Sequence, residues 1–143
     1  MNALIDTNVL LDVLTEREPF YKDSAVIWSL AEENCIQGYI SAISVNNVYY
    51  ITRKLKDKKT AGTLVDKILK DFNVIALTYE ILKLARTIDA DYEDLIQYFS
   101  ALQKGCDYII TRDPNGFPKK GIKIIKPTIF IKKFFPGDGT LSL

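Results

Sequence analysis

The chain has 143 residues, of which 48% are hydrophobic and 26% are charged, and its formal net charge is +1. A chain of this length can bury a hydrophobic core without disulfides, and its composition excludes disordered and fibrous proteins. The small net charge gives no global indication of a nucleic-acid partner, so any basic surface must be local.

Histidine is absent from the sequence. Its absence excludes a histidine general base, a Ser-His triad and histidine-ligated zinc. The only cysteines, Cys35 and Cys106, are too few for a structural zinc site, and we expect both to be buried free thiols in a reducing compartment. No segment approaches the ~20 apolar residues that span a membrane and no signal peptide is recognisable, so we expect a cytoplasmic protein.

Apolar runs and helical spacing alternate along the chain. They predict strands at residues 3–5, 39–40, 73–77, 107–111 and 121–125. They predict helices at residues 9–14, 21–34, 44–52, 60–72, 79–85, 95–104 and 127–134. This alternation is typical of an α/β fold with a central parallel sheet of about four to five strands and helices on both faces. We expect one domain over residues 1–135 and a disordered tail over residues 136–143.

Three carboxylates occur where such a sheet would bring them together. Asp6 ends the first strand, Asp94 opens the helix at 95–104, and Asp113 follows the strand at 107–111. Converging carboxylates raise one another's pKa, and Mg²⁺ or Mn²⁺ relieves their repulsion. Each acid also has a simpler interpretation: Asp6 as a helix cap, Asp94 as a partner of a helix dipole, and Asp113 as the start of a turn. Their combination favours a functional site.

Three motifs resemble those of PIN-domain proteins and occur in the same order. They are LIDTNVLLD at residues 4–12, EDLIQ at 93–97 and DYIITRD at 107–113. The resemblance covers residues 1–134 and implies a metal-dependent ribonuclease with a three-layer α/β/α fold. Many small prokaryotic members of this family are toxins of toxin–antitoxin pairs. The resemblance further implies that Asp6, Asp94 and Asp113 bind one or two Mg²⁺ or Mn²⁺ ions.

The same resemblance assigns supporting residues and reveals one departure from the family. It implies that Asn8 shapes the loop around Asp6 and that Thr111 makes a supporting hydrogen bond near the last acid. The family usually has a Glu in the helix after the second strand, where this chain has Asn47. An amide carbonyl can ligate Mg²⁺ but brings no charge, so the predicted site has three formal charges in place of four.

Three further acids are candidates to replace the missing charge, namely Glu93, Asp91 and Asp12. Glu93 is the best placed because it adjoins Asp94, although neighbouring helical residues point about 100° apart. For all three we favour a solvated acidic surface, because acidic residues are mostly exposed.

Local basic clusters fit an RNA partner. Residues 112–135 contain seven Lys or Arg and one acid, and a second basic run occupies residues 53–59. Such clusters bind phosphates, although a solvated surface is an equal interpretation for the second run. The candidate RNA contacts are Arg53, Arg112, Lys119 and Lys120.

The sequence therefore predicts a Mg²⁺- or Mn²⁺-dependent endoribonuclease, and the resemblance suggests RNA, an antitoxin and a second copy of the chain as partners. A catalytically silent PIN-like module that binds RNA or protein is the alternative, because Asn47 removes a charge. A third possibility is a Mg²⁺-dependent phosphatase or phosphoryl-accepting domain. Those enzymes often carry a second Asp two residues after the first, where this chain has Asn8, and no Gly-rich phosphate loop is present, so we rank this possibility lowest.

Overall fold

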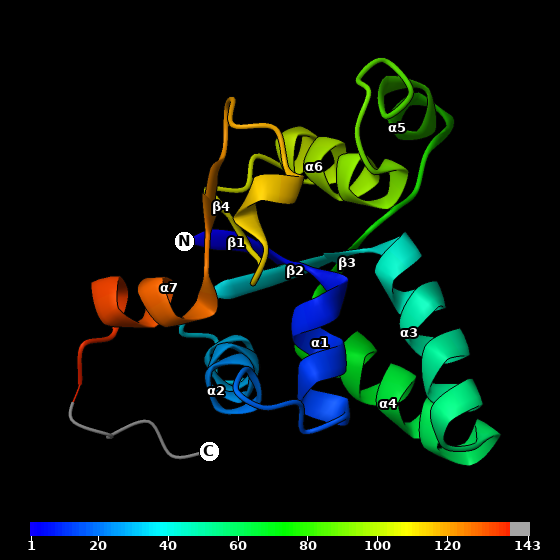
Figure 1. Cartoon of the computed structure of the whole chain (residues 1–143), viewed down its shortest axis with the longest axis vertical. Helices are drawn as coiled ribbons and strands as arrows, with labels where there is room; N and C mark the ends of the chain where they lie inside the picture. The colour runs from blue at the N-terminus through cyan, green and yellow to red at the C-terminus, as the bar shows by residue number, and fades with distance from the viewer. Residues whose placement is uncertain (138–143) are drawn as a thin grey trace.

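The structure is a computed structural model that describes residues 1–137, and a five-stranded sheet in the order β3-β2-β1-β4-β5 forms its centre (Figure 1). The strands are β1 Asn2–Ile5, β2 Gln37–Ser41, β3 Asn73–Ile75, β4 Tyr108–Ile110 and β5 Lys123–Ile125. Every neighbouring pair is parallel, which confirms the predicted class of sheet. The last three strands are shorter than predicted, although backbone hydrogen bonds from Asp107 to Asn2 and from Thr111 to Ile125 continue the pairing just beyond the ends of β4.

Helices connect the strands and cover both faces of the sheet. They are α1 Thr7–Leu14, α2 Tyr21–Glu32, α3 Ala42–Leu55, α4 Lys58–Asp71, α5 Tyr79–Leu84, α6 Tyr92–Lys104 and α7 Pro127–Phe134, with the 3₁₀ helix η1 at Pro114–Gly116. In Figure 1, α5 and α6 lie above the sheet, and α1, α2, α4 and α7 lie below it. Side chains alternate accordingly: Ala3 and Ile5 belong to the lower core, whereas Leu4 belongs to the core under α6. The predicted three-layer α/β/α architecture is confirmed.

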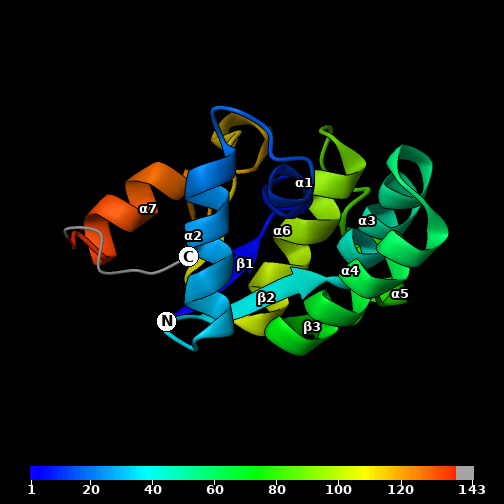
Figure 2. The ribbon, with the colours of Figure 1, turned by 90° about the horizontal axis from the view of Figure 1, so that it is seen from below.

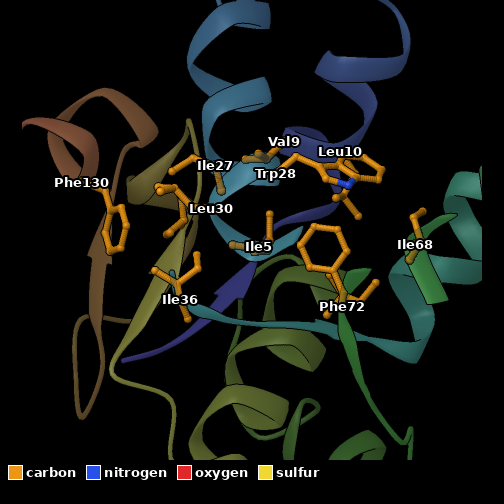
Figure 3. Packing of buried hydrophobic residues seen from close by; sticks show 14 of the residues in the cluster. Ile5, Val9, Leu10, Ile27, Trp28, Leu30, Ile36, Ile68, Phe72 and Phe130 are labelled. Carbon is orange, nitrogen blue, oxygen red and sulfur yellow. The ribbon is translucent and has the colours of Figure 1, made fainter. Parts of the chain in front are cut away.

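The lower core is the larger one, and Figure 3 shows Trp28 and Phe72 at one end of it. Their ring centroids lie 5.2 Å apart in an edge-to-face arrangement, and the Trp28 indole donates to Asp71 Oδ2 at 2.8 Å. A Cβ at Gly38 of β2 would lie 2.8 Å from the Cβ of Ala31. Glycine is required there because α2 packs closely on β2, and Figure 2 shows α2 in front of the sheet with α7 beside it.

The two cysteines lie in different environments. Cys106 is buried, and burial raises the pKa of its thiol to about 11. Cys35 is exposed, so the prediction that both thiols are buried is wrong for this residue. The physical reason is the turn after α2, where Asn34 adopts a φ of 58° and directs the chain back toward β2.

The described residues end at Gly137, so the predicted disordered tail at 136–143 lies almost entirely outside them. Within residues 1–137, none of the helices is both long enough and apolar enough to cross a membrane.

The order of the strands reverses beside β1. The chain adds β2 and β3 on one side of β1, and then β4 and β5 on the other. Open parallel sheets bind ligands at the carboxyl ends of the strands next to such a reversal. Asp6 follows β1 at this edge and Thr111 follows β4. The fold therefore places both residues where a ligand site is expected.

Candidate active site

Asp6 joins β1 to α1, and its side chain is only 3% exposed. Its backbone N–H donates to the carbonyl of Ile110, which extends the pairing of β1 with β4. Gln97 Nε2 donates to Asp6 Oδ1 at 2.9 Å, and Thr111 Oγ1 donates to Asp6 Oδ2 at 2.9 Å. The side chain of Asp6 makes no capping hydrogen bond to α1, so the interpretation of this carboxylate as a helix cap is wrong.

The two side chains that hydrogen-bond to Asp6 are uncharged, so burial has the largest effect on the pKa of Asp6. Burial raises the pKa of Asp6 above its ordinary value of 3.8, and the hydrogen bonds from Gln97 and Thr111 offset that effect only in part. The nearby charge of Glu93 raises the pKa further. Within residues 1–137, no Lys or Arg forms an ion pair with the buried Asp6.

A second set of hydrogen bonds surrounds Thr7, the residue after Asp6. The Thr7 hydroxyl donates to Glu93 Oε1 at 2.9 Å and is hydrogen-bonded to the Ser44 hydroxyl at 2.6 Å. Gln97 Oε1 accepts from the Thr7 backbone N–H at 3.3 Å and from the Ser44 hydroxyl at 3.4 Å. This network ties α3 and α6 to the first turn of α1, and Gln97 connects it to Asp6.

Asp94 lies in the first turn of α6, but another residue caps that helix. Asp91 accepts the backbone N–H of Asp94 at 3.0 Å, which leaves the carboxylate of Asp94 free to point elsewhere. That carboxylate lies against η1, since a Cβ at Gly116 would be 2.8 Å from Asp94 Oδ2. Burial raises the pKa of Asp94 to about 7, and the charges of Asp6, Asp91, Glu93 and Asp113 add to the effect. The acids at the start of α6 and those that follow β1 and β4 therefore share one negative field.

Asp113 is exposed at the start of η1 and makes no capping hydrogen bond with its side chain. Its backbone N–H donates to Thr111 Oγ1 at 3.1 Å, and the same hydroxyl donates to Asp6. The supporting hydrogen bond predicted for Thr111 is therefore present. Thr111 connects the chain at Asp113 to the buried carboxylate of Asp6.

The donor set fits a hard divalent cation in its chemistry. Carboxylate oxygens are the ligands that Mg²⁺ and Mn²⁺ prefer, and a cation would relieve the repulsion that raises the pKa of Asp94. The side chains do not form a ready-made cage, because no three Cys, Asp or Glu side chains within residues 1–137 are grouped as a metal site.

Other predicted residues have different surroundings. Asn8 is exposed in the first turn of α1, so the expected loop around Asp6 is in fact the start of a helix. Asn47 is half-buried on α3. Of the three acids considered as replacements for the missing charge, Asp91 is exposed as expected, whereas Glu93 is half-buried and Asp12 is 1% exposed. The interpretation of a solvated acidic surface is therefore wrong for Asp12, whereas Glu93 is partly exposed.

The buried Asp12 interacts with Arg112. Arg112 Nε lies 3.2 Å from Asp12 Oδ2, and the guanidinium stacks on the Phe20 ring with its carbon 4.6 Å from the centroid. Burial raises the pKa of Asp12 although the charge of Arg112 opposes that shift. Arg112 therefore has an internal partner.

The remaining predicted RNA contacts are exposed and widely separated. Arg53 belongs to α3, and Lys119 and Lys120 belong to the segment between η1 and β5. These two segments lie at opposite ends of the sheet in Figure 1. They do not form one continuous basic patch.

Comparison with known proteins identifies the family. A family model described as PIN domain matches residues 2–115. The chain belongs to the PIN domain family. It is also 25% identical over 138 residues to Ribonuclease VapC1 of Aquifex aeolicus, an alignment that covers 92% of this chain and 94% of that protein.

Solved structures of similar chains support the PIN fold. A toxin–antitoxin complex from Klebsiella pneumoniae contains a chain with a TM-score of 0.64 and 22% identity, covering 87% of this chain and 97% of that one. DNA-bound VapBC from Salmonella typhimurium contains a chain with a TM-score of 0.65 and 15% identity, covering 89% and 98%. At these identities the likeness shows the fold.

Gln97 is the site residue of this PIN domain that sequence reasoning missed. It is 0% exposed and contacts both Asp6 and Thr7. A signal was present, because Gln97 is a polar residue in an apolar stretch of α6 and follows Asp94 by three positions, on the same face of the helix. The identity of its partner depends on tertiary packing.

Proposed function

We propose that this PIN domain is a Mg²⁺- or Mn²⁺-dependent endoribonuclease that hydrolyses phosphodiester bonds of RNA. The observation that carries the proposal is the buried Asp6 carboxylate, which only neutral side-chain donors hold and which shares one negative field with the half-buried Asp94. Membership of the PIN family and the likeness to Ribonuclease VapC1 support the same activity. Asp6, Asp94 and Asp113 would hold one or two cations.

The residues of the chain have distinct tasks in this proposal. Gln97 and Thr111 fix both oxygens of Asp6, so this carboxylate is preorganised. Asp94 is half-buried at the start of α6 with its carboxylate against η1, where it would hold the cation together with Asp6. Asp113 is exposed and accessible to a phosphodiester from solvent. A bound divalent cation would supply charge neutralisation and lower the pKa of the attacking water.

The experiment is cleavage of a generic single-stranded RNA by the purified chain, with Mn²⁺ or with a chelator. We expect cleavage with Mn²⁺ and none with the chelator. We expect Asp6→Asn and Asp94→Asn to reduce the rate at least about 100-fold, on the scale of lost electrostatic stabilisation. Asp66→Asn, at an exposed position on α4, is the matched control and should retain the wild-type rate. Wild-type rates in both site variants would contradict the assignment.

We further propose that the protein is the toxin of a toxin–antitoxin pair in the cytoplasm and that it forms a homodimer. The support is the fold shared with chains of toxin–antitoxin complexes. Expression of the wild type should arrest growth, Asp6→Asn should not, and co-expression of a small protein encoded beside it should relieve the arrest. Equal arrest by wild type and Asp6→Asn would contradict a nuclease toxin. The comparisons do not favour a catalytically silent module.

A further inference from the structure

Helix α3 borders the candidate site without bringing a charge to it. Its Ser44 is hydrogen-bonded to Thr7, the residue after Asp6, at 2.6 Å. Asn47 follows Ser44 by three positions, on the same side of α3, and is half-buried. The side of α3 nearest to Asp6 therefore presents an amide where a carboxylate would complete the acidic set.

Glu93 approaches the same corner from α6. Its Oε1 accepts the Thr7 hydroxyl at 2.9 Å, and the Thr7 and Ser44 hydroxyls are themselves in contact. Thr7 thus links the carboxylate of Glu93 to the point where α1 meets α3. Glu93 starts from a different helix, and its carboxylate ends at the Thr7 hydroxyl, which also contacts Ser44 of α3, three positions before Asn47.

Glu93 lies among other acids, and its hydrogen-bond partner is neutral. It is half-buried, adjoins Asp94 at the start of α6, and its carboxylate accepts the hydroxyl of Thr7, the residue after Asp6. Carboxylate oxygens are the ligands that a hard divalent cation prefers, and such a cation would balance several neighbouring charges at once.

We propose that Glu93 supplies the fourth carboxylate of the cation site, in the place that a glutamate at position 47 would otherwise fill from α3. This inference rests on the proposed function, in which the site binds Mg²⁺ or Mn²⁺. The Thr7 hydroxyl positions the carboxylate through Oε1, and the carboxylate remains partly open to solvent and to a cation. In this proposal, a carboxylate on α6 takes the place of the carboxylate that α3 lacks.

The test is calorimetric titration of the full chain with Mn²⁺, without RNA. Glu93→Gln is the informative variant, because its amide oxygen can still accept the Thr7 hydroxyl while the charge is lost. Asp91→Asn is the matched control: it removes one charge from the same turn and still caps α6. The double variant Glu93→Gln/Asn47→Glu moves the carboxylate from α6 to α3. Thermal unfolding verifies that each variant is folded.

We expect Glu93→Gln to weaken Mn²⁺ binding by about 10- to 100-fold, as for groups that support a metal site. Asp91→Asn should cause a much smaller loss, and Asn47→Glu should restore most of the affinity in the Glu93→Gln background. Equal losses in Glu93→Gln and Asp91→Asn would overturn the inference, because net charge alone would explain them. If Asn47→Glu does not restore the Mn²⁺ affinity, the inference that the Glu93 carboxylate takes the place of a carboxylate on α3 is wrong.

The failure of this inference differs from that of the proposed function. If Asp6→Asn abolishes Mn²⁺ binding while Glu93→Gln binds as tightly as the wild type, Glu93 is not a ligand and the proposed function stands. If the wild type neither binds Mn²⁺ nor cleaves RNA, both proposals are wrong.

Discussion

The variant Gln97→Leu tests whether the neutral amide of Gln97 stabilises the folded protein through its hydrogen bond to the buried Asp6. Gln97 donates to Asp6 Oδ1 at 2.9 Å and accepts the backbone N–H of Thr7 at 3.3 Å. Leucine has a similar size but can do neither. The substitution therefore removes one of the two side-chain donors to a buried carboxylate and leaves an N–H in the first turn of α1 without its acceptor.

The magnitude follows from these two losses. A hydrogen bond to a charged group contributes about 1.5–3 kcal/mol, and a buried N–H left unpaired costs about 1–3 kcal/mol. Burying the apolar leucine offsets about 1 kcal/mol of this. We expect the free energy of unfolding to fall by about 2–4 kcal/mol, equivalent to a Tm lower by roughly 5–15 °C. The loss should shrink at acidic pH, because a protonated Asp6 depends less on a donor.

Urea titration near neutral pH, followed by circular dichroism, measures the change. Gln103→Leu provides the matched control, because Gln103 lies on the same helix and is exposed. We expect that control to change the free energy of unfolding by less than about 0.5 kcal/mol. A Gln97→Leu protein as stable as the control would refute the role of the amide.

Three further predictions concern the field around Asp94 and a glycine remote from it. Because the pKa of Asp94 is raised from 3.8 to about 7, the folded metal-free protein holds this proton longer than the unfolded chain. Its free energy of unfolding should therefore fall by roughly 1–2 kcal/mol, after allowance for solvent screening, as pH rises from about 4 to about 7. Urea titrations across this pH range measure the change, and an Asp94→Asn protein whose free energy of unfolding depends on pH as steeply as that of the wild type would contradict the prediction. Gly116→Ala should displace the Asp94 carboxylate, 2.8 Å from the added Cβ, and weaken Mn²⁺ binding in calorimetry with little change in Tm; unchanged affinity would exclude Asp94 from the site. Gly62→Ala adds a Cβ that meets nothing within 4 Å inside α4, so it should raise the free energy of unfolding by about 0.5–1 kcal/mol, and a loss of stability would contradict that expectation.

The architecture could be predicted because it depends on local periodicity. Short apolar runs such as 3–5 alternate with amphipathic segments such as 60–72, and a parallel sheet covered by helices is the arrangement that buries both. The placement of Asp6 at a strand end followed from the same pattern. The exposure of Cys35 did not, because it depends on the left-handed conformation of Asn34 in a turn.

Which residues hydrogen-bond to Asp6 could not be predicted, since they come from distant parts of the chain. Gln97 and Thr111 are 91 and 105 residues from Asp6 in sequence. The acidity of a segment also says little about the exposure of its members: Asp91 is exposed, whereas Glu93, two residues later, is half-buried and bonded to Thr7. Only packing between helices decides between these outcomes.

The surroundings of Asp6 agree with the cation site proposed above. A buried carboxylate is most simply stabilised by an arginine or lysine, which would lower its pKa and balance its charge. The chain has Arg112 directly after Thr111, yet this guanidinium lies against Asp12 and Phe20, while Asp6 is left with an amide and a hydroxyl. Burial raises the pKa of Asp6, and neither of its hydrogen-bond partners carries a charge that would lower it. Departures of this kind from local rules are typical of functional sites, and this one agrees with the proposed divalent cation.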